Sequence, residues 1–235
     1  MKKISTLIIL FFSIFILGCT IEDKGKSNFK NEFQPVKLNY LALGDSYTIG
    51  QSVCDTCRFP AQLSKELQKI FIKDSINTKI IAKTGWTTTN LITAIDSETL
   101  TNDYDLVTLL IGVNNQYQNR PFSIYENEFL ILVNKAIELA KGNQSNLIVV
   151  SIPDYAFTPF GDGETRISIE IDKYNKYAEN YCLKNNIAYI NITDITREGL
   201  ENPNLVATDG LHPSKLAYSK FVERILPKAV SVLKK

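Results

Sequence analysis

The sequence predicts an α/β fold, namely a single three-layer α/β/α domain around a five-stranded, mostly parallel sheet. Short apolar segments alternate with longer amphipathic segments from residue 38 onward. Several of the short segments are almost wholly apolar, as expected for strands buried on both faces. Five such strand–helix repeats fit one doubly wound sheet with helices on both faces, and an apolar content of 44% supplies an ordinary core.

The elements follow one another in order. Strands are expected at 38–43, 79–82, 106–111, 147–152 and 188–190, where the apolar runs are too short for helices. Helices are expected at 59–71, 88–95, 123–141, 167–183 and 214–233, where apolar residues recur with a helical period. Pro60 suits a first helical turn, and Ser123 with Glu126 forms a capping box for the third helix. Pro227 is expected to bend or split the last helix.

The amino terminus is expected to lie outside this domain. Lys2 and Lys3 precede an apolar run too short to span a bilayer, so residues 1–18 read as a signal peptide. The run 16–19 resembles a bacterial lipoprotein box, which predicts lipidation of Cys19 and a flexible polar tether over 19–37. The alternative is a simple anchor, or a cleaved signal with an incidental cysteine. Either way, the domain at 38–235 is expected outside the cytosol, on the periplasmic side or at the cell surface.

Three further cysteines carry information about the compartment. Cys54 and Cys57 form a C-x-x-C pair, whereas Cys182 lies alone in an amphipathic segment and suits a small core position. A zinc site would need two more ligands, and outside the cytosol a local disulfide is favoured. A redox-active pair stays open as an alternative. No metal and no other cofactor is expected.

The balance of charged residues limits the kinds of partner that the protein can bind. Lys and Arg number 26 against 25 Asp and Glu, for a net charge of +1. This balance argues against nucleic acid as a partner.

Polar residues follow the predicted strands where a parallel sheet places ligands. Ser46 follows the first strand, Gly85 the second and Asn114 the third. Asp209 and His212 lie in the last loop, before the closing helix. Since ligands bind beyond the carboxyl ends of such strands, these segments are expected to meet at one sheet edge.

Histidine chemistry can use only one residue, because His212 is the sole histidine of the chain. A serine hydroxyl needs a neighbouring base to become a nucleophile, and an acid near the histidine can fix its tautomer. Taken singly, Ser46, Asp209 and His212 have ordinary explanations as turn or helix-start residues. Their joint order along the chain favours the hypothesis that they are catalytic.

The run Gly-Asp-Ser at 44–46, the glycine at 85, Gly-x-Asn at 112–114 and Asp-x-x-His-Pro at 209–213 resemble the blocks of the SGNH (GDSL-type) hydrolases. The resemblance extends over residues 38–230 and implies a flavodoxin-like sheet. It also implies a Ser46–His212–Asp209 triad that forms an acyl-enzyme. The oxyanion hole would consist of the Ser46 and Gly85 amides and the Asn114 side chain.

Two positions depart from the family pattern and bear on substrate choice. Tyr47 stands where leucine is usual, and Asn115 stands where aspartate is usual. With Asp45 and Tyr117, they are expected to line the substrate pocket. Arg120, Tyr155 and Phe157 are candidates for its mouth.

The resemblance implies a serine esterase acting on a small-molecule or glycan ester. Short acyl groups on carbohydrate or another alcohol are favoured, since no long apolar stretch suggests a lid over a lipid pocket. One alternative is a lysophospholipase or thioesterase, and another is a non-catalytic glycan-binding surface lipoprotein. A flavodoxin-like or phosphate-binding module is disfavoured, because residues 44–46 lack a glycine-rich lysine loop. Membrane attachment would come from the lipid on Cys19, and the sequence predicts no oligomeric state.

Overall fold

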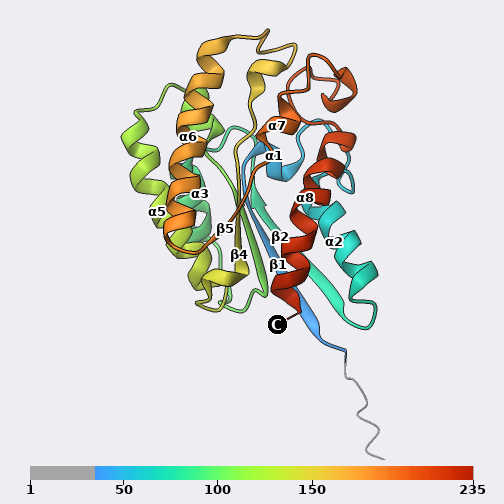
Figure 1. Cartoon of the computed structure of the whole chain (residues 1–235). Helices are drawn as coiled ribbons and strands as arrows, with labels where there is room; N and C mark the ends of the chain where they lie inside the picture. The colour runs from blue at the N-terminus through green and yellow to red at the C-terminus, as the bar shows by residue number, and fades with distance from the viewer. Residues whose placement is uncertain (1–34, 235) are drawn as a thin grey trace, which may run out of the picture. The chain divides into compact units, whose positions relative to one another are not determined.

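Five strands, all paired in parallel, form the sheet at the centre of the computed structural model, which describes residues 35–234 (Figure 1). They are β1 (Lys37–Gly44), β2 (Ser75–Ala82), β3 (Leu106–Leu110), β4 (Leu147–Val150) and β5 (Ala188–Ile190). The order across the sheet is β2-β1-β3-β4-β5. This is the flavodoxin-like order, so the predicted α/β class and the five-stranded parallel sheet are confirmed.

The burial of each strand follows its place in the sheet. Every residue of β3 and β4 is buried, as their almost wholly apolar sequences predict. The edge strand β2 is longer than predicted, because it starts at Ser75 and pairs with β1 along its whole length. Its first residues are polar and partly exposed, so they carry no apolar run that could indicate a strand.

Five long helices cover the two faces of the sheet, which gives the three predicted layers (Figure 1). Helices α2 (Phe59–Ile70) and α8 (Lys215–Leu233) pack against each other on one face. Helices α3 (Thr88–Ser97), α5 (Phe122–Leu139) and α6 (Thr165–Lys184) lie together on the other. A buried core runs through the domain and includes Cys182, which is fully buried as predicted.

The predicted cap of α5 and the predicted split of α8 are wrong. Helix α5 begins at Phe122 with Pro121 at its N-cap, so Ser123 lies within the first turn and does not cap it. Phe122 instead anchors this end, with its ring 4.9 Å from that of Tyr174 on α6. Helix α8 runs as one element through Pro227, which neither splits it nor ends it.

Short elements that the apolar pattern does not reveal connect the long ones. Three are single helical turns: α1 (Ser46–Ile49), α4 (Val113–Tyr117) and α7 (Thr193–Thr196). Three are 3₁₀ turns: η1 (Gln144–Asn146), η2 (Tyr155–Phe157) and η3 (Pro203–Leu205). Helices α1 and α4 follow β1 and β3 directly, at the carboxyl edge of the sheet.

The predictions for the amino terminus fall largely outside the described part of the chain. The signal peptide at 1–18, the lipidated Cys19 and residues 20–34 of the tether all lie there, and they stay predictions. Strand β1 begins at Lys37, one residue before the predicted start of the domain. Among the helices within residues 35–234, none has the length and apolarity needed to cross a membrane.

The junction between β1 and α1 leaves no room for a side chain at Gly44. A Cβ there would lie 2.1 Å from Thr48 Oγ1 and 2.4 Å from the Leu110 carbonyl oxygen. We therefore expect Gly44→Ala to lower the free energy of unfolding by about 3 kcal/mol in urea denaturation, because the backbone must shift to relieve the overlap.

The matched control is Gly142→Ala, where φ is +68° but no atom lies within 4 Å of a Cβ. It should cost only about 1 kcal/mol, from the left-handed backbone alone. Equal losses for the two variants would contradict the steric explanation.

Candidate active site

The carboxyl ends of β1, β2 and β3 and the loop before α8 border one cavity of about 190 Å³. Four of the residues predicted for catalysis line it: Ser46, Gly85, Asn114 and His212. The other lining residues are Tyr47, Thr84, Val113, Tyr117, Tyr155, Phe160 and Leu211. Segments far apart in the sequence thus meet at one site.

Ser46 is placed by the turn from β1 into α1. It is the first residue of α1, and Asp45 caps this helix by accepting a hydrogen bond from the Tyr47 amide at 3.0 Å. Gly50 ends the helix in a left-handed conformation with φ at 79°. Ser46 is only 3% exposed, so its hydroxyl is shielded from bulk water yet borders the cavity.

His212 and Asp209 form the hydrogen-bonded pair that a serine hydrolase needs. The distance between His212 Nδ1 and Asp209 Oδ2 is 2.6 Å. A carboxylate at Nδ1 assigns the proton of a neutral ring to that nitrogen, which leaves Nε2 as the basic atom. The backbone amides of Leu211 and His212 both donate to Asp209 Oδ1 at 3.0 Å.

The charge on Asp209 is stabilised by these donors. Partial burial raises the pKa of its carboxyl, but hydrogen bonds from Ser52, His212 and Leu211 outweigh that effect. The pKa of Asp209 therefore lies well below its usual range. The group remains an acceptor for Nδ1–H at neutral pH.

The loop that carries His212 is braced by backbone contacts. Val206 and Pro213 form an isolated antiparallel bridge. The Ala207 amide donates to the His212 carbonyl at 2.7 Å, and the Ser214 amide donates to the Leu205 carbonyl at 2.9 Å. These contacts fix the position of the imidazole although it lies outside the regular elements.

Gly85 and Asn114 border the same cavity as His212. Gly85 has φ at 82°, and its carbonyl accepts a hydrogen bond from Gln118 Nε2 at 3.0 Å, which ties this turn to α4. Asn114 Nδ2 donates to the Trp86 carbonyl at 3.1 Å and more weakly to Asp45 Oδ2 at 3.4 Å. The amide of Asn114 is thus held at the cavity wall, against Asp45, the residue before Ser46.

Asp45 is a fully buried carboxyl beneath this site. Desolvation raises its pKa to about 7, although hydrogen bonds from Tyr47 and Asn114 oppose the shift. The neighbouring Tyr47 is also buried, and its ring lies 5.2 Å from the His212 ring. Tyr47 therefore forms the cavity wall beside the His212 imidazole.

The predicted pocket residues separate into two groups. Tyr47 and Tyr117 line the cavity, and so does the mouth candidate Tyr155. Asp45 and Asn115 do not line the cavity, so the prediction that they form part of the substrate pocket is wrong. Both are fully buried. Asn115 accepts from the Thr88 amide at 3.0 Å and donates to Thr88 Oγ1 at 2.7 Å, so it joins α4 to the start of α3. Neither Arg120 nor Phe157 lines the cavity.

Two features were missed by reasoning from the sequence. Phe160 reaches the cavity mouth from the loop between η2 and α6, where no periodic pattern marks it. Ser52 donates from its hydroxyl to Asp209 across 157 residues of sequence. No local motif indicates so distant a contact.

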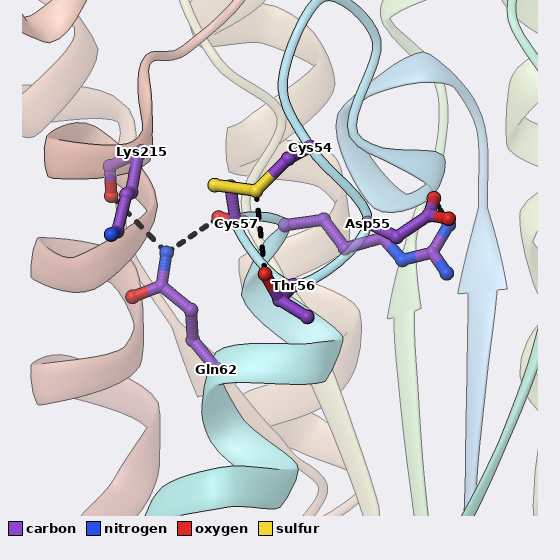
Figure 2. Close-up of a disulfide and its surroundings, with 7 residues drawn as sticks. Cys54, Asp55, Thr56, Cys57, Gln62 and Lys215 are labelled. Atoms are coloured by element: carbon purple, nitrogen blue, oxygen red, sulfur yellow. Dashed lines mark hydrogen bonds and ion pairs between the residues drawn. A yellow bond between two sulfur atoms is a disulfide. The ribbon is translucent and has the colours of Figure 1, made fainter.

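The cysteine pair lies near this second feature. Cys54 and Cys57 form a disulfide in the loop between α1 and α2 (Figure 2). Within residues 35–234, no group of three or more His, Cys, Asp or Glu side chains is arranged to hold a metal ion.

Comparisons with known proteins agree with this geometry. Residues 42–220 match the model of the GDSL-like lipase/acylhydrolase family. No curated protein matches the chain. Among solved structures, an acetylxylan esterase from Geobacillus stearothermophilus is similar, with a TM-score of 0.64 at 19% identity over 83% of this chain and 95% of that one.

Two further solved structures show the same fold. TesA has a TM-score of 0.65 at 14% identity, over 83% of this chain and 99% of that one. A lipase/acylhydrolase from Enterococcus faecalis has a TM-score of 0.64 at 19% identity, over 81% and 94% of the two chains. At these identities the likeness is one of fold.

The buried Asp45 should make stability depend on pH. Its pKa of about 7 lies above the value of about 4 for an aspartate in an unfolded chain, so the folded state binds more protons between these values. The free energy of unfolding contributed by Asp45 should therefore fall as the pH rises from about 4 to about 7.

Urea denaturation across this pH range, with Asp45→Asn as the comparison, measures the effect. The asparagine variant cannot titrate at this position, so its stability should decline less with pH than that of the parent. Parallel pH curves for the two proteins would refute the assignment.

Proposed function

The chain belongs to the GDSL-like lipase/acylhydrolase family, and we propose that it hydrolyses carboxylic esters through a Ser46–His212–Asp209 triad and an acyl-enzyme. Ester hydrolysis by a serine hydrolase is the activity of this class. One observation carries the assignment of the triad: Ser46 and His212 line the same cavity, and His212 Nδ1 is bonded to Asp209.

The reaction begins with proton transfer within the cavity. His212 Nε2 removes the proton of the Ser46 hydroxyl as Oγ attacks the ester carbonyl. When the tetrahedral intermediate collapses, the same nitrogen donates the proton to the departing alcohol. Water then attacks the acyl carbon as His212 Nε2 takes its proton, and the imidazolium returns that proton to Ser46 Oγ as the bond from Oγ to the acyl carbon breaks and the acid is released. Asp209 stabilises the imidazolium that forms in each half of the reaction.

Negative charge develops on the carbonyl oxygen during both attacks. The donors proposed for it are the backbone amides of Ser46 and Gly85 and the side-chain amide of Asn114. All three residues border the cavity, and they come from three different strand ends. Fixed donors of this kind require little reorganisation during the reaction, which is why they contribute strongly to rate.

The shape of the cavity supports a short acyl group. Its volume of about 190 Å³ is modest, and buried residues such as Ser46, Tyr47 and Asn114 form its floor. Tyr117 and Phe160 stand at the mouth with 51% and 52% of their surface exposed. Their ring centroids lie 6.0 Å apart, and both rings contact Tyr155.

An exposed aromatic mouth above a small, largely apolar cavity suits a short acyl group on an alcohol that itself has an apolar face. We therefore favour short acyl esters of carbohydrate or another alcohol. The fold shared with an acetylxylan esterase is consistent with this choice. A lipid acyl ester is the alternative, because the same rings could contact an alkyl chain.

The nucleophile is tested by substitution and by covalent labelling. Ser46→Ala should abolish hydrolysis of p-nitrophenyl acetate and labelling by a fluorophosphonate probe, since no hydroxyl remains to attack. Thr84→Ser, which keeps a hydroxyl at the cavity wall, is the matched control and should still be labelled. Retained labelling in Ser46→Ala would exclude Ser46 as nucleophile, and an unlabelled parent protein would favour a non-catalytic glycan-binding role.

The substrate class is tested with p-nitrophenyl esters from acetate to palmitate beside acetylated xylo-oligosaccharides and a lysophospholipid. We expect kcat/KM to be highest for acetate or another short acyl group, because the cavity is small. Tyr117→Ala should raise KM for the acetylated sugar more than for p-nitrophenyl acetate, since an exposed aromatic contact is lost. A maximum at long chains, or a preference for the lysophospholipid, would overturn this choice.

A further inference from the structure

Asp209 has a side-chain partner that the triad does not require. The Ser52 hydroxyl donates to Asp209 Oδ2 at 2.5 Å, and this is the oxygen that also bonds His212 Nδ1 at 2.6 Å. The other oxygen, Oδ1, is held by the amides of Leu211 and His212. The carboxylate is thus fixed at both oxygens, and Ser52 is the contact that comes from outside its own loop.

Ser52 is held in an unusual backbone conformation. Its φ is +65°, in the left-handed region that a residue other than glycine seldom adopts. Such a conformation has a free-energy cost and persists where the surrounding structure enforces it. The conformation therefore points to restraints on this loop.

Several contacts supply that restraint. The Val53 amide donates to the Gly50 carbonyl at 3.2 Å, so this hydrogen bond spans Ser52. Just before Ser52, Gln51 Oε1 accepts a hydrogen bond from the Thr84 hydroxyl at 2.6 Å. Beyond Ser52, the disulfide between Cys54 and Cys57 closes the next turn.

Gln62 connects this turn to the histidine loop. Figure 2 shows its side-chain amide between two carbonyls from separate parts of the chain. Gln62 Nε2 donates to the Cys57 carbonyl at 2.5 Å and to the Lys215 carbonyl at 3.2 Å. Lys215 begins α8, three positions after His212. Gln62 thus ties the disulfide-closed turn to the start of α8, just beyond the histidine loop.

We propose that Ser52 is a positioning residue that acts through Asp209, and that the Cys54–Cys57 disulfide holds the loop that presents its hydroxyl. This inference rests on the proposed triad. A carboxylate held from two directions keeps its plane toward Nδ1–H while the imidazole gains and loses a proton. Without Ser52, Asp209 can rotate away from the ring, and fewer enzyme molecules have the histidine correctly oriented.

Two substitutions separate the hydroxyl from the backbone strain. Ser52→Ala removes the donor and keeps the strain, whereas Ser52→Gly removes the donor and relieves it. Both should lower kcat for p-nitrophenyl acetate about tenfold with KM unchanged, as expected for a lost hydrogen bond to a charged group. Ser52→Gly should unfold at a temperature no lower than that of the parent protein, so a fall in its kcat cannot come from instability. Ser97→Ala, at an exposed serine in the last turn of α3, is the control and should keep full activity.

A double-mutant cycle with Asp209→Ala tests whether Ser52 acts through that carboxylate. In the Asp209→Ala background, adding Ser52→Ala should leave the residual kcat unchanged, because the acceptor is already gone. A further tenfold fall would mean that Ser52 acts elsewhere and would overturn the proposal. Unchanged kcat in both single Ser52 variants would overturn it as well.

The disulfide is tested by replacing Cys54 and Cys57 together with serine. This variant should lose several-fold in kcat in the parent protein but nothing further in the Ser52→Gly background, where the hydroxyl is already absent. Full activity of the cysteine variant would refute the role of the disulfide. These outcomes differ from failure of the proposed function, in which the parent protein itself would neither hydrolyse esters nor label at Ser46.

Discussion

The parallel register of β1 with its two neighbours, β2 and β3, is the constraint on which the rest of the site depends. Gly44 at the end of β1 pairs with Ala82 of β2 and with Leu110 of β3. The three chains therefore leave the sheet at the same level. The segments that carry Ser46, Gly85 and Asn114 follow within a few residues and border the same cavity.

Close packing at this edge explains why the turn after β1 has its particular residues. Gly44 leaves no space for a Cβ beside Leu110 and Thr48, so the chain can turn directly from strand into helix. Asp45 then caps α1 from a fully buried position and contacts Asn114 across the sheet edge. Burial of this carboxyl costs stability when it is ionised, but its two oxygens connect the turn that carries Ser46 to Asn114 on α4. The site thus combines local destabilisation with fixed geometry, as functional sites often do.

The features that could be predicted from sequence are those that repeat or that follow strands. The apolar runs at β3 and β4 indicated buried strands, and the candidate site residues just beyond β1, β2 and β3 had to meet if the sheet was parallel. The roles of single residues were harder to predict from the sequence. Asn115 stands next to Asn114 but points into the interior, because successive residues of α4 face different sides of a short helix. Its role depends on Thr88 of another helix, which no local pattern reveals.

The same limit applies to Ser52 and to the start of β2. Ser52 lies in a loop, and its partner is 157 residues away, so only the three-dimensional fold brings the two together. The first residues of β2 are polar because an edge strand is exposed on one side, and an apolar run is therefore absent there. Contacts that depend on tertiary structure override local patterns at both places.

The two halves of the site are held by different kinds of interaction. Ser46 follows a strand whose neighbours are hydrogen-bonded along its length, so its position is coupled to the core of the domain. His212 and Asp209 lie in a loop that depends on a few backbone contacts around Val206 and Ala207 and on the hydroxyl of Ser52. Changes in that loop can therefore alter the orientation of the base without disturbing the sheet. Such changes would act on turnover more than on stability, whereas changes at Gly44 or Asp45 would act on both.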